Sequence, residues 1–471
     1  MSNKRPNLIY IFADQWRRQA VGFMKEDPVI TPNMDKFAEE SLVFDNAISC
    51  FPLCSPHRAS LLTGKYPLST GFFTNCKIGC DVRLKEEEIC IGDVLKTSDY
   101  DTAYIGKWHL DLPEVNLSDN PISGARNWDA YTEPGPKRHG FEHWYSYGTF
   151  DEHLTPHYWK DTAEMIKIDQ WSVEHETDMT LDYLRSHGQD KPFTLFLSWN
   201  PPHSPYDQVP EKYRKLYEGR EIPLRENLSL ERSVFGVGDI YNGDFEKLKE
   251  HTLNYYAAVS GLDENFGRIL EELKNLGLEE NTIVVLSSDH GDMMGSHGLI
   301  SKNIWYEESI GVPFIIRWPN KIKDGRTDLL FASPDIMPTL LGAMGLDIPE
   351  TVEGRDFSAS LIGEQCEDQS SVYICSCPGS EALIKSFKKE GLKPEEYGWR
   401  GVRTKRYTYV VNKGYVPSEN KLERYLYDNK EDPYQKNPLK LNSAEENSIA
   451  LELEGELKEW LVKLEDQFTI Y

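Results

Sequence analysis

The sequence has no excess of basic residues. Its 52 lysines and arginines stand against 77 aspartates and glutamates, which gives the 471-residue chain a formal charge of -25. Proteins that bind nucleic acids neutralise phosphates with clustered lysine and arginine, so this balance argues against a nucleic-acid partner. It leaves room for a small anion, because a few cations in a cleft can outweigh a distant acidic surface that salt screens.

A long apolar segment is also missing. After Lys4 and Arg5, the first apolar run covers residues 8–13 and is too short for the core of a signal peptide. No segment is long enough to span a bilayer, so we expect a soluble protein with no membrane partner. The chain as printed is expected to be cytoplasmic; a signal peptide removed beforehand would make it periplasmic or secreted.

Paired Cys-x-x-Cys motifs are missing too, which argues against a structural zinc site. The spacing of the eight cysteines gives no clear disulfide framework either. We expect buried thiols and leave open one bridge, between Cys76 and Cys80. The cysteines are Cys50, Cys54, Cys76, Cys80, Cys90, Cys366, Cys375 and Cys377.

The sequence does contain short apolar runs that alternate with helical segments. Continuous apolar runs are typical of strands buried on both faces of a sheet. Three helical patterns are present: one begins at Thr31, a second follows Pro56 and a third covers residues 246–276. The alternation predicts an α/β fold in which helices sandwich a large, mostly parallel sheet. The predicted strands are residues 7–12, 100–106, 193–199 and 282–286.

The pattern changes after about residue 365. Short strand candidates are followed by a charged amphipathic helix over residues 444–467. This order predicts a smaller α+β domain on an antiparallel sheet. We therefore predict an N-terminal domain over residues 1–365 and a C-terminal subdomain over residues 366–471. The strand candidates are residues 371–375, 401–403, 407–411 and 425–427.

Polar residues follow each of the four runs in the first domain. In parallel α/β sheets, ligands bind beyond the carboxyl ends of the strands. Each residue alone is compatible with a helix cap or a solvated side chain, but together they predict one shared site. These residues are Asp14, Lys107 with His109, His203, and Asp289 with His290.

The two aspartates predict a metal ion at that site. If Asp14 and Asp289 lie close together, their carboxylates repel one another unless a cation lies between them. Gln15 adds a carbonyl oxygen and His290 an imidazole nitrogen. Oxygen-rich ligands suit Ca²⁺ or Mg²⁺, and the histidine admits Mn²⁺. The alternative is that both aspartates only cap the turns that follow them.

Cys54 begins the motif Cys54-Ser55-Pro56-His57-Arg58, at the start of an expected helix. Backbone N–H groups at a helix start favour negative charge, and Arg58 adds a cation one turn later. These features predict a lowered thiol pKa and a reactive sulfur. A buried structural cysteine is the alternative that the motif alone leaves open.

The motif and the Leu-Thr-Gly-Lys run after it resemble the signature of the sulfatase family. Residues 6–15, 106–110, 288–291 and 403–433 resemble further blocks of that family, in the same order, so the resemblance covers essentially the whole chain. It implies an alkaline phosphatase-like fold, with residues 1–365 as the catalytic domain. It also implies that a maturation enzyme oxidises Cys54 to formylglycine (3-oxoalanine).

For the nucleophile, the resemblance implies a hydrated formylglycine at position 54 that attacks sulfur. The metal and Arg58 would favour its ionised oxygen. The ion implied by the resemblance is Ca²⁺, with Mn²⁺ and Mg²⁺ left open. Its ligands would be Asp14, Gln15, Cys54, Asp289 and His290.

The resemblance assigns the other catalytic roles to two lysines and two histidines. Lys107 and Lys302 would offset negative charge on the sulfuryl oxygens. His203 would protonate the departing alcohol. His109 would remove the proton from the second hydroxyl, and this loss would expel sulfate and reform the aldehyde.

The expected substrate is a small sulfate ester, and the aromatic content and extra loops favour a sulfated sugar. Asn75, Trp399 and Arg400 are candidate substrate-binding residues. Specificity is expected to reside in two loops, residues 116–138 and 207–244. The sequence leaves the oligomeric state open.

Two positions depart from the family pattern. His57 stands where the family usually has serine or alanine, and Gln15 stands where many members have a second aspartate. The Asp-Gln pair also occurs in related phosphonate monoester hydrolases, so phosphonate monoester or phosphodiester hydrolysis at the same site is the alternative. A third reading is a non-enzymatic relative that binds a ligand and keeps Cys54 unconverted.

Overall fold

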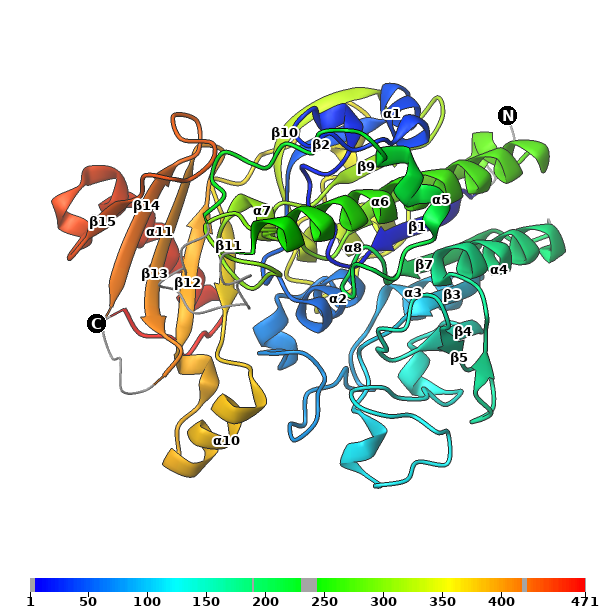
Figure 1. The fold of residues 1–471 in the computed structure, drawn as a ribbon, viewed down its shortest axis with the longest axis horizontal. Coiled ribbons are helices and arrows are strands. Elements are labelled where there is room, and N and C mark those ends of the chain that lie inside the picture. Colours follow the sequence, from blue (N-terminus) through cyan, green and yellow to red (C-terminus); the bar gives the residue numbers. More distant parts are fainter. Residues whose placement is uncertain (1–4, 189, 230–243, 417–421, 471) are drawn as a thin grey trace.

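The larger part of the protein is built on an 8-stranded sheet with the order β10-β2-β9-β8-β1-β7-β3-β4 (Figure 1). The computed structural model describes residues 5–188, 190–229, 244–416 and 422–470. Neighbouring strands pair in parallel except at β9, which runs antiparallel to β2 and β8. The strands are β1 (Asn7–Ala13), β2 (Leu42–Ile48), β3 (Asp101–Lys107), β4 (His143–Tyr147), β7 (Phe193–Trp199), β8 (Thr282–Ser288), β9 (Phe314–Arg317) and β10 (Gly325–Ala332).

Helices cover both faces of this sheet, and alternate residues of β1 separate the two cores. Ile9 and Ile11 pack in the core that contains α1 (Pro32–Glu39), α4 (Ser172–Ser186) and α6 (Phe245–Asn275). Leu8, Tyr10 and Phe12 pack in the other core. Its helices are α2 (Cys54–Thr63), α3 (Ile91–Thr97) and α8 (Ile336–Met344). Because both faces are covered, every residue of β1, β7 and β8 is buried, which explains their apolar runs.

Short elements complete this part of the chain. They are α5 (Glu211–Arg214), α7 (Glu307–Ile310), α9 (Ser358–Leu361) and a 2-stranded sheet of β5 (His157–Tyr158) and β6 (Ile166–Lys167). Of the two predicted specificity loops, residues 116–138 contain no strand and no α-helix. Residues 230–243 of the second loop lie outside the described residues. Among the described helices, none is both long enough and apolar enough to cross a membrane.

The C-terminal part is a 5-stranded antiparallel sheet with the order β11-β12-β13-β14-β15. One face packs on α11 (Ser448–Lys463), with Tyr373 and Leu457 in the same core, and the other carries Ile374 against Trp305 of the larger part. A further helix, α10 (Glu381–Glu390), connects β11 to β12. The strands are β11 (Val372–Ser376), β12 (Gly398–Arg403), β13 (Tyr407–Gly414), β14 (Glu423–Asp428) and β15 (Leu439–Leu441).

This architecture confirms the predicted fold class, with small changes at the ends of elements. The boundary predicted between residues 365 and 366 falls between α9 and β11. The helix predicted over residues 444–467 is interrupted, because Asn447 Oδ1 accepts the N–H groups of Ile449 and Ala450 and starts α11 afresh. All eight cysteines are free, so the Cys76–Cys80 bridge that we left open is not formed.

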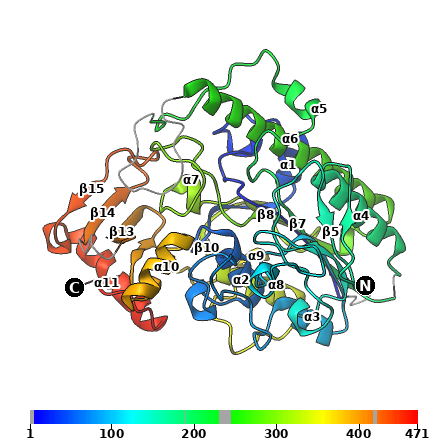
Figure 2. The same ribbon diagram turned by 60° about the horizontal axis from the view of Figure 1, so that its bottom comes forward.

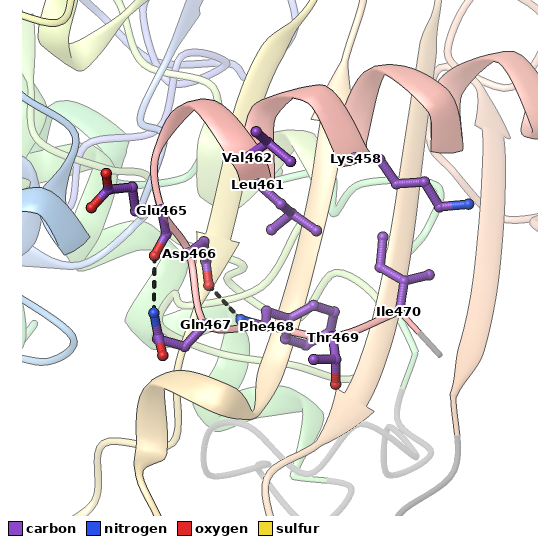
Figure 3. A pocket seen from close by; sticks show the side chains of 9 residues that line it. All are labelled: Lys458, Leu461, Val462, Glu465, Asp466, Gln467, Phe468, Thr469 and Ile470. Carbon is purple, nitrogen blue, oxygen red and sulfur yellow. Dashed lines mark hydrogen bonds between the residues drawn. The ribbon is translucent and has the colours of Figure 1, made fainter.

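A buried ion pair closes the C-terminal part. Arg400 of β12 donates from Nε to Asp466 Oδ2 at 2.7 Å, and the two side chains are 0% and 1% exposed. Asp466 lies in the turn after α11, beside a cavity of about 380 Å³ that α11 and the following residues line (Figure 3). Burial raises the pKa of Asp466, but Arg400 outweighs burial and holds the pKa below its usual value. The pair therefore fixes the end of the chain to the sheet.

Replacing Arg400 with methionine leaves Asp466 buried without its counter-ion. We expect the free energy of unfolding to fall by about 3–5 kcal/mol, the range for removing one partner of a buried pair. Denaturant titration followed by circular dichroism measures this loss. Arg406→Met is the matched control, because its pair with Asp428 is exposed and exposed pairs contribute little to stability. Equal losses in the two variants would contradict the proposed role of the buried pair.

Candidate active site

Two aspartates meet at one edge of the large sheet. β1 and β8 pair with Ala13 opposite Ser288, so the next residues, Asp14 and Asp289, emerge side by side. The N–H of Asp289 donates to the carbonyl of Ala13 at 3.3 Å. The N–H of Gln15 donates to Oδ1 of Asp289 at 3.0 Å. Both carboxylates are fully buried, so the register of two strands places two like charges in a dry environment.

Cys54 and His290 complete a group of four potential metal ligands. Cys54 is the first residue of α2, and its Sγ lies 3.5 Å from Oδ1 of Asp14 and 3.3 Å from Nε2 of His290. One ligand atom from each of Asp14, Cys54, Asp289 and His290 lies within 4.8 Å of the other three. This spacing suits a single ion, and the two carboxylates favour a hard divalent cation.

Arg58 and Lys107 offset the charge of Asp14. Nη2 of Arg58 lies 3.0 Å from Asp14 Oδ2 and 3.3 Å from Asp289 Oδ2, and Nζ of Lys107 lies 2.8 Å from Asp14 Oδ2. Burial raises the pKa of Asp14, but Lys107, His203 and Arg58 outweigh burial and hold the pKa well below its usual value. Burial and the charge of Asp14 raise the pKa of Asp289 to about 7.

The thiol of Cys54 is not activated by its place at the helix start. Burial and the nearby carboxylate of Asp14 raise its pKa to about 11, against the opposing effects of Lys302 and Lys107. Our prediction of a lowered thiol pKa is therefore wrong. The reason is that the helix terminus and cations compete with complete burial and an adjacent negative charge, and burial is the largest effect.

Gln15, Lys302 and His203 form a chain of contacts beside the four ligands. Nζ of Lys302 donates to Oε1 of Gln15 and lies 2.8 Å from Nε2 of His203. Nδ1 of His203 lies 2.7 Å from the carbonyl of Ser204, which can only accept, so Nδ1 carries the proton and Nε2 accepts from Lys302. The carbonyl oxygen of Gln15, a predicted metal ligand, therefore binds Lys302 in this structure.

Ser55 links the helix start to two more predicted residues. Its N–H donates to Oδ1 of Asn75 at 3.0 Å, and its hydroxyl donates to the carbonyl of His109 at 2.7 Å. Nε2 of His109 donates to the carbonyl of Cys76 at 3.2 Å, while the buried Nδ1 has no hydrogen-bond partner among the described residues. Asn75 thus holds the start of α2, and His109 presents a free ring nitrogen.

Sequence reasoning missed three residues of this site. Asn200, the first residue after β7, accepts a hydrogen bond from Nζ of Lys107 at 3.0 Å. Its amide donates to Oδ1 of Asp151 at 3.2 Å. Ser198, near the end of β7, accepts from Nη1 of Arg58 at 2.7 Å. The strand-end rule that selected Asp14 also applies to Asn200, whereas nothing in the sequence marks Asp151.

The structure does not bring Trp399 and Arg400 to this cluster. Trp399 is buried with its ring edge-on to Trp305, at 5.6 Å between ring centroids. Arg400 is bonded to Asp466 and to backbone carbonyls of the C-terminal part. Both side chains have structural partners, so we do not include them in the proposed substrate site.

A family model described as Sulfatase matches residues 6–346. The chain belongs to the sulfatase family. A second model, described as N-sulphoglucosamine sulphohydrolase, C-terminal, matches residues 295–466. The predicted resemblance is thus confirmed, and with it the alkaline phosphatase-like fold of a sulfatase enzyme.

Relatives of this sulfatase match it over nearly its full length. An endo-4-O-sulfatase of Bacteroides thetaiotaomicron is 39% identical over 98% of this chain and 93% of its own. An ulvan-active sulfatase of Formosa agariphila is 36% identical over 98% of this chain and 82% of its own. A solved structure from work on the metabolism of multiple glycosaminoglycans by Bacteroides thetaiotaomicron aligns with a TM-score of 0.87 and 37% identity, covering 98% of this chain and 97% of that one.

A phosphonate monoester hydrolase of Agrobacterium radiobacter also aligns with this sulfatase. Its TM-score is 0.76 at 22% identity, over 98% of this chain and 96% of that one. At that identity the likeness shows the fold alone. The specific alternative of phosphonate hydrolysis gains no support beyond the shared architecture.

The donor set of the sulfatase fits a divalent cation. Oδ2 of Asp289 is buried with no hydrogen-bond partner among the described residues. The two carboxylates repel each other, and a cation between them removes that repulsion. Nε2 of His290 lies 3.5 Å from Asp14 and 3.6 Å from Asp289, while its Nδ1 lies 3.0 Å from the carbonyl of Gly291. Such a backbone contact on the second ring nitrogen is usual for a metal-binding histidine.

Chelation of divalent ions by EDTA is expected to lower the midpoint of thermal unfolding, and added Ca²⁺, Mn²⁺ or Mg²⁺ to restore it. An ion that binds only the folded state stabilises it by about 2.7 kcal/mol at a hundredfold excess over Kd. Asp289→Asn should abolish this shift, which scanning fluorimetry records.

The matched control lies in a second group of possible ligands, Cys90, Asp93 and His139. That group has a single carboxylate, and Oδ2 of Asp93 already accepts the N–H of Cys90 at 3.0 Å. Asp93→Asn should leave the metal-dependent shift at its original size. If the shift survives Asp289→Asn and disappears in Asp93→Asn, the ion binds at the second group and the proposed metal site is contradicted.

Proposed function

We propose that this sulfatase removes sulfate from a carbohydrate sulfate ester, with Cys54 converted to formylglycine and Ca²⁺ bound beside it. The observation that carries the proposal is the contact of Cys54 with Asp14 and His290, within a chain whose sulfatase match covers residues 6–346. Relatives named for sulfated carbohydrate chemistry support the substrate class. Because Cys54 is 1% exposed, a maturation enzyme would have to act before this region folds.

A hydrated aldehyde at position 54 supplies one hydroxyl for attack on sulfur and a second whose deprotonation releases sulfate, and a divalent cation adds Lewis acidity. Sγ of Cys54 marks where these oxygens would begin. Arg58 and Lys107 are both buried against Asp14 and keep positive charge in a site with little water. Fixed charges act more strongly there than in bulk water, so they can stabilise a sulfuryl group as its bonds change.

Two histidines present nitrogens suited to opposite proton transfers. Nε2 of His203 accepts from Lys302, so the pair holds a proton that can pass to the departing alcohol. His109 donates from Nε2 to Cys76, which leaves Nδ1 as the lone-pair nitrogen for a proton from the second hydroxyl. These contacts support the assignment of His203 as acid and His109 as base.

Cys54→Ala should reduce sulfate release by about 10⁴-fold or more, as loss of a catalytic nucleophile does. The assay measures sulfate released from a panel of defined sulfated monosaccharides. Cys366→Ala is the control, because that thiol is only partly buried and lies outside the cluster. Peptide mass spectrometry of protein made with a maturation enzyme should find residue 54 lighter than cysteine. Normal turnover by Cys54→Ala would refute the proposed nucleophile.

Parallel assays with an aryl sulfate and an aryl phosphonate decide between the two reactions. A much higher rate on the phosphonate would overturn sulfate-ester hydrolysis as the main activity.

His203→Ala should slow the hydrolysis of sugar sulfates by about 10²–10⁴-fold, the usual contribution of a general acid. The loss should be much smaller on an aryl sulfate whose leaving group needs no proton. His153→Ala serves as a comparison, because it removes a neighbouring imidazole, whose Nε2 lies 2.8 Å from the backbone carbonyl of His203, and leaves the proposed acid in place. An equal loss by His203→Ala on both substrates would argue against proton donation.

A further inference from the structure

Helix α10 carries three lysines and two glutamates, a small excess of positive charge in a chain whose formal charge is -25. Lys385, Lys388 and Lys389 are exposed and lie three and four residues apart, so they occupy one face of the helix. Lys393 is exposed just beyond the end of the helix. Phe387 is fully buried and packs on Tyr397 at 5.0 Å between ring centroids. The lysine face, residues 385, 388 and 389, therefore lies on the side of α10 away from the buried Phe387.

Within the described residues, no carboxylate lies at salt-bridge distance from any of these four lysines. Glu390 accepts a hydrogen bond from Ser386 instead, and Glu381, at the start of the helix, acts on the pKa of Lys77. Elsewhere on the molecule acidic residues outnumber basic ones, with a formal charge of -25 for the chain. The face is thus a local site of attraction for anions.

The start of α10 adjoins the active site. Thr74 Oγ1 donates to the carbonyl of Gly379 at 3.2 Å, and Nζ of Lys77 donates to the same oxygen. Asn75, between them, holds Ser55 and the start of α2. Both ribbon views place α10 on the side of the molecule that contains α2, away from α1 and α6 (Figures 1 and 2). At 1.5 Å per residue, Lys389 lies roughly 14 Å along the helix from Ser380, beyond the reach of a single sugar at position 54.

We propose that the lysine face of α10 binds anionic groups of a sulfated polysaccharide chain whose reacting sulfate lies at position 54. This inference rests on the proposed carbohydrate sulfatase function and specifies that the preferred substrate is a polysaccharide rather than a single sugar. Charge complementarity selects the occupant: a polyanion offers repeated negative groups, and the lysine face offers three exposed amines. One end of the chain is fixed in the site, so its flanking charges stay near α10.

The test is the triple charge reversal Lys385→Glu, Lys388→Glu and Lys389→Glu in the full-length, matured enzyme. For a sulfated polysaccharide chain, kcat/KM should fall about tenfold, in line with the effect of local charge on association. For a sulfated disaccharide cut from the same polysaccharide, kcat/KM should stay within about twofold, because that substrate reaches the start of α10 but not the lysines farther along the helix. Added salt should slow wild-type turnover of the chain more than turnover by the variant.

A control triple, Lys25→Glu, Lys36→Glu and Lys274→Glu, makes the same change in net charge near α1 and α6. These lysines are also exposed, and the control should turn over the chain normally. An equal loss in the two triples would show a general charge effect and overturn the inference. So would an unchanged ratio of chain to disaccharide turnover in the α10 triple.

A binding measurement tests the lysine face independently of turnover. It compares the affinity of Cys54→Ala for the intact sulfated polysaccharide with and without the α10 charge reversal. The Kd should rise about tenfold with the reversal. If no sulfated sugar is hydrolysed but this difference in Kd remains, the proposed function is wrong, whereas binding of the polysaccharide by the lysine face is supported. If sugars are hydrolysed and Kd is unchanged, binding by the lysine face is wrong, whereas the proposed function is supported. Weaker binding to anionic lipid vesicles alone would assign the face to a membrane and overturn the inference.

Discussion

The repulsion between two buried carboxylates is the constraint on which the site depends. Parallel pairing of β1 with β8 fixes Asp14 beside Asp289, and neither side chain reaches water. Arg58 and Lys107 compensate Asp14, whose pKa stays well below its usual value, but the pKa of Asp289 rises to about 7. The unbalanced charge favours a divalent cation, because positive charge in addition to Arg58 and Lys107 is the direct way to keep both carboxylates ionised. The sheet register thereby creates the charge arrangement that a metal ion would stabilise.

Helix α2 makes Cys54, the proposed nucleophile, and the cation Arg58 part of one rigid unit. Cys54 and Arg58 are four residues apart and so lie on the same face of the helix. Ser55 anchors that end of the helix to Asn75 and to the backbone of His109. A change in the position of α2 would therefore move the nucleophile, a cation and the neighbouring loop together. Because they move together, Cys54 and Arg58 keep their relative positions even where no hydrogen bond joins them directly.

The sequence predicted the parts of this arrangement that depend on strand periodicity. Continuous apolar runs identified the buried strands, and the rule for strand ends then selected Asp14, Lys107 and Asp289. The position of Arg400 could not be predicted in this way. Its partner Asp466 is 66 residues away, and no local pattern shows which face of β12 Arg400 occupies. The prediction for the thiol pKa of Cys54 failed for another reason. Desolvation raised that pKa, and a short sequence motif does not show whether its cysteine is completely buried.

Burial also explains how an acidic protein can attract an anion. Arg58 and Lys107 both contact Asp14 but are buried away from the surface carboxylates and from dissolved salt, so their fields act in the site with little screening. The lysines of α10 are exposed, and salt limits their influence to about 8 Å at physiological ionic strength. Such charges contribute little to capture of a free ion from a distance. They act on an anion that is already held nearby, which is the situation of a polymer bound at one of its sulfates. Exposed and buried cations can therefore serve the same substrate at successive stages of binding.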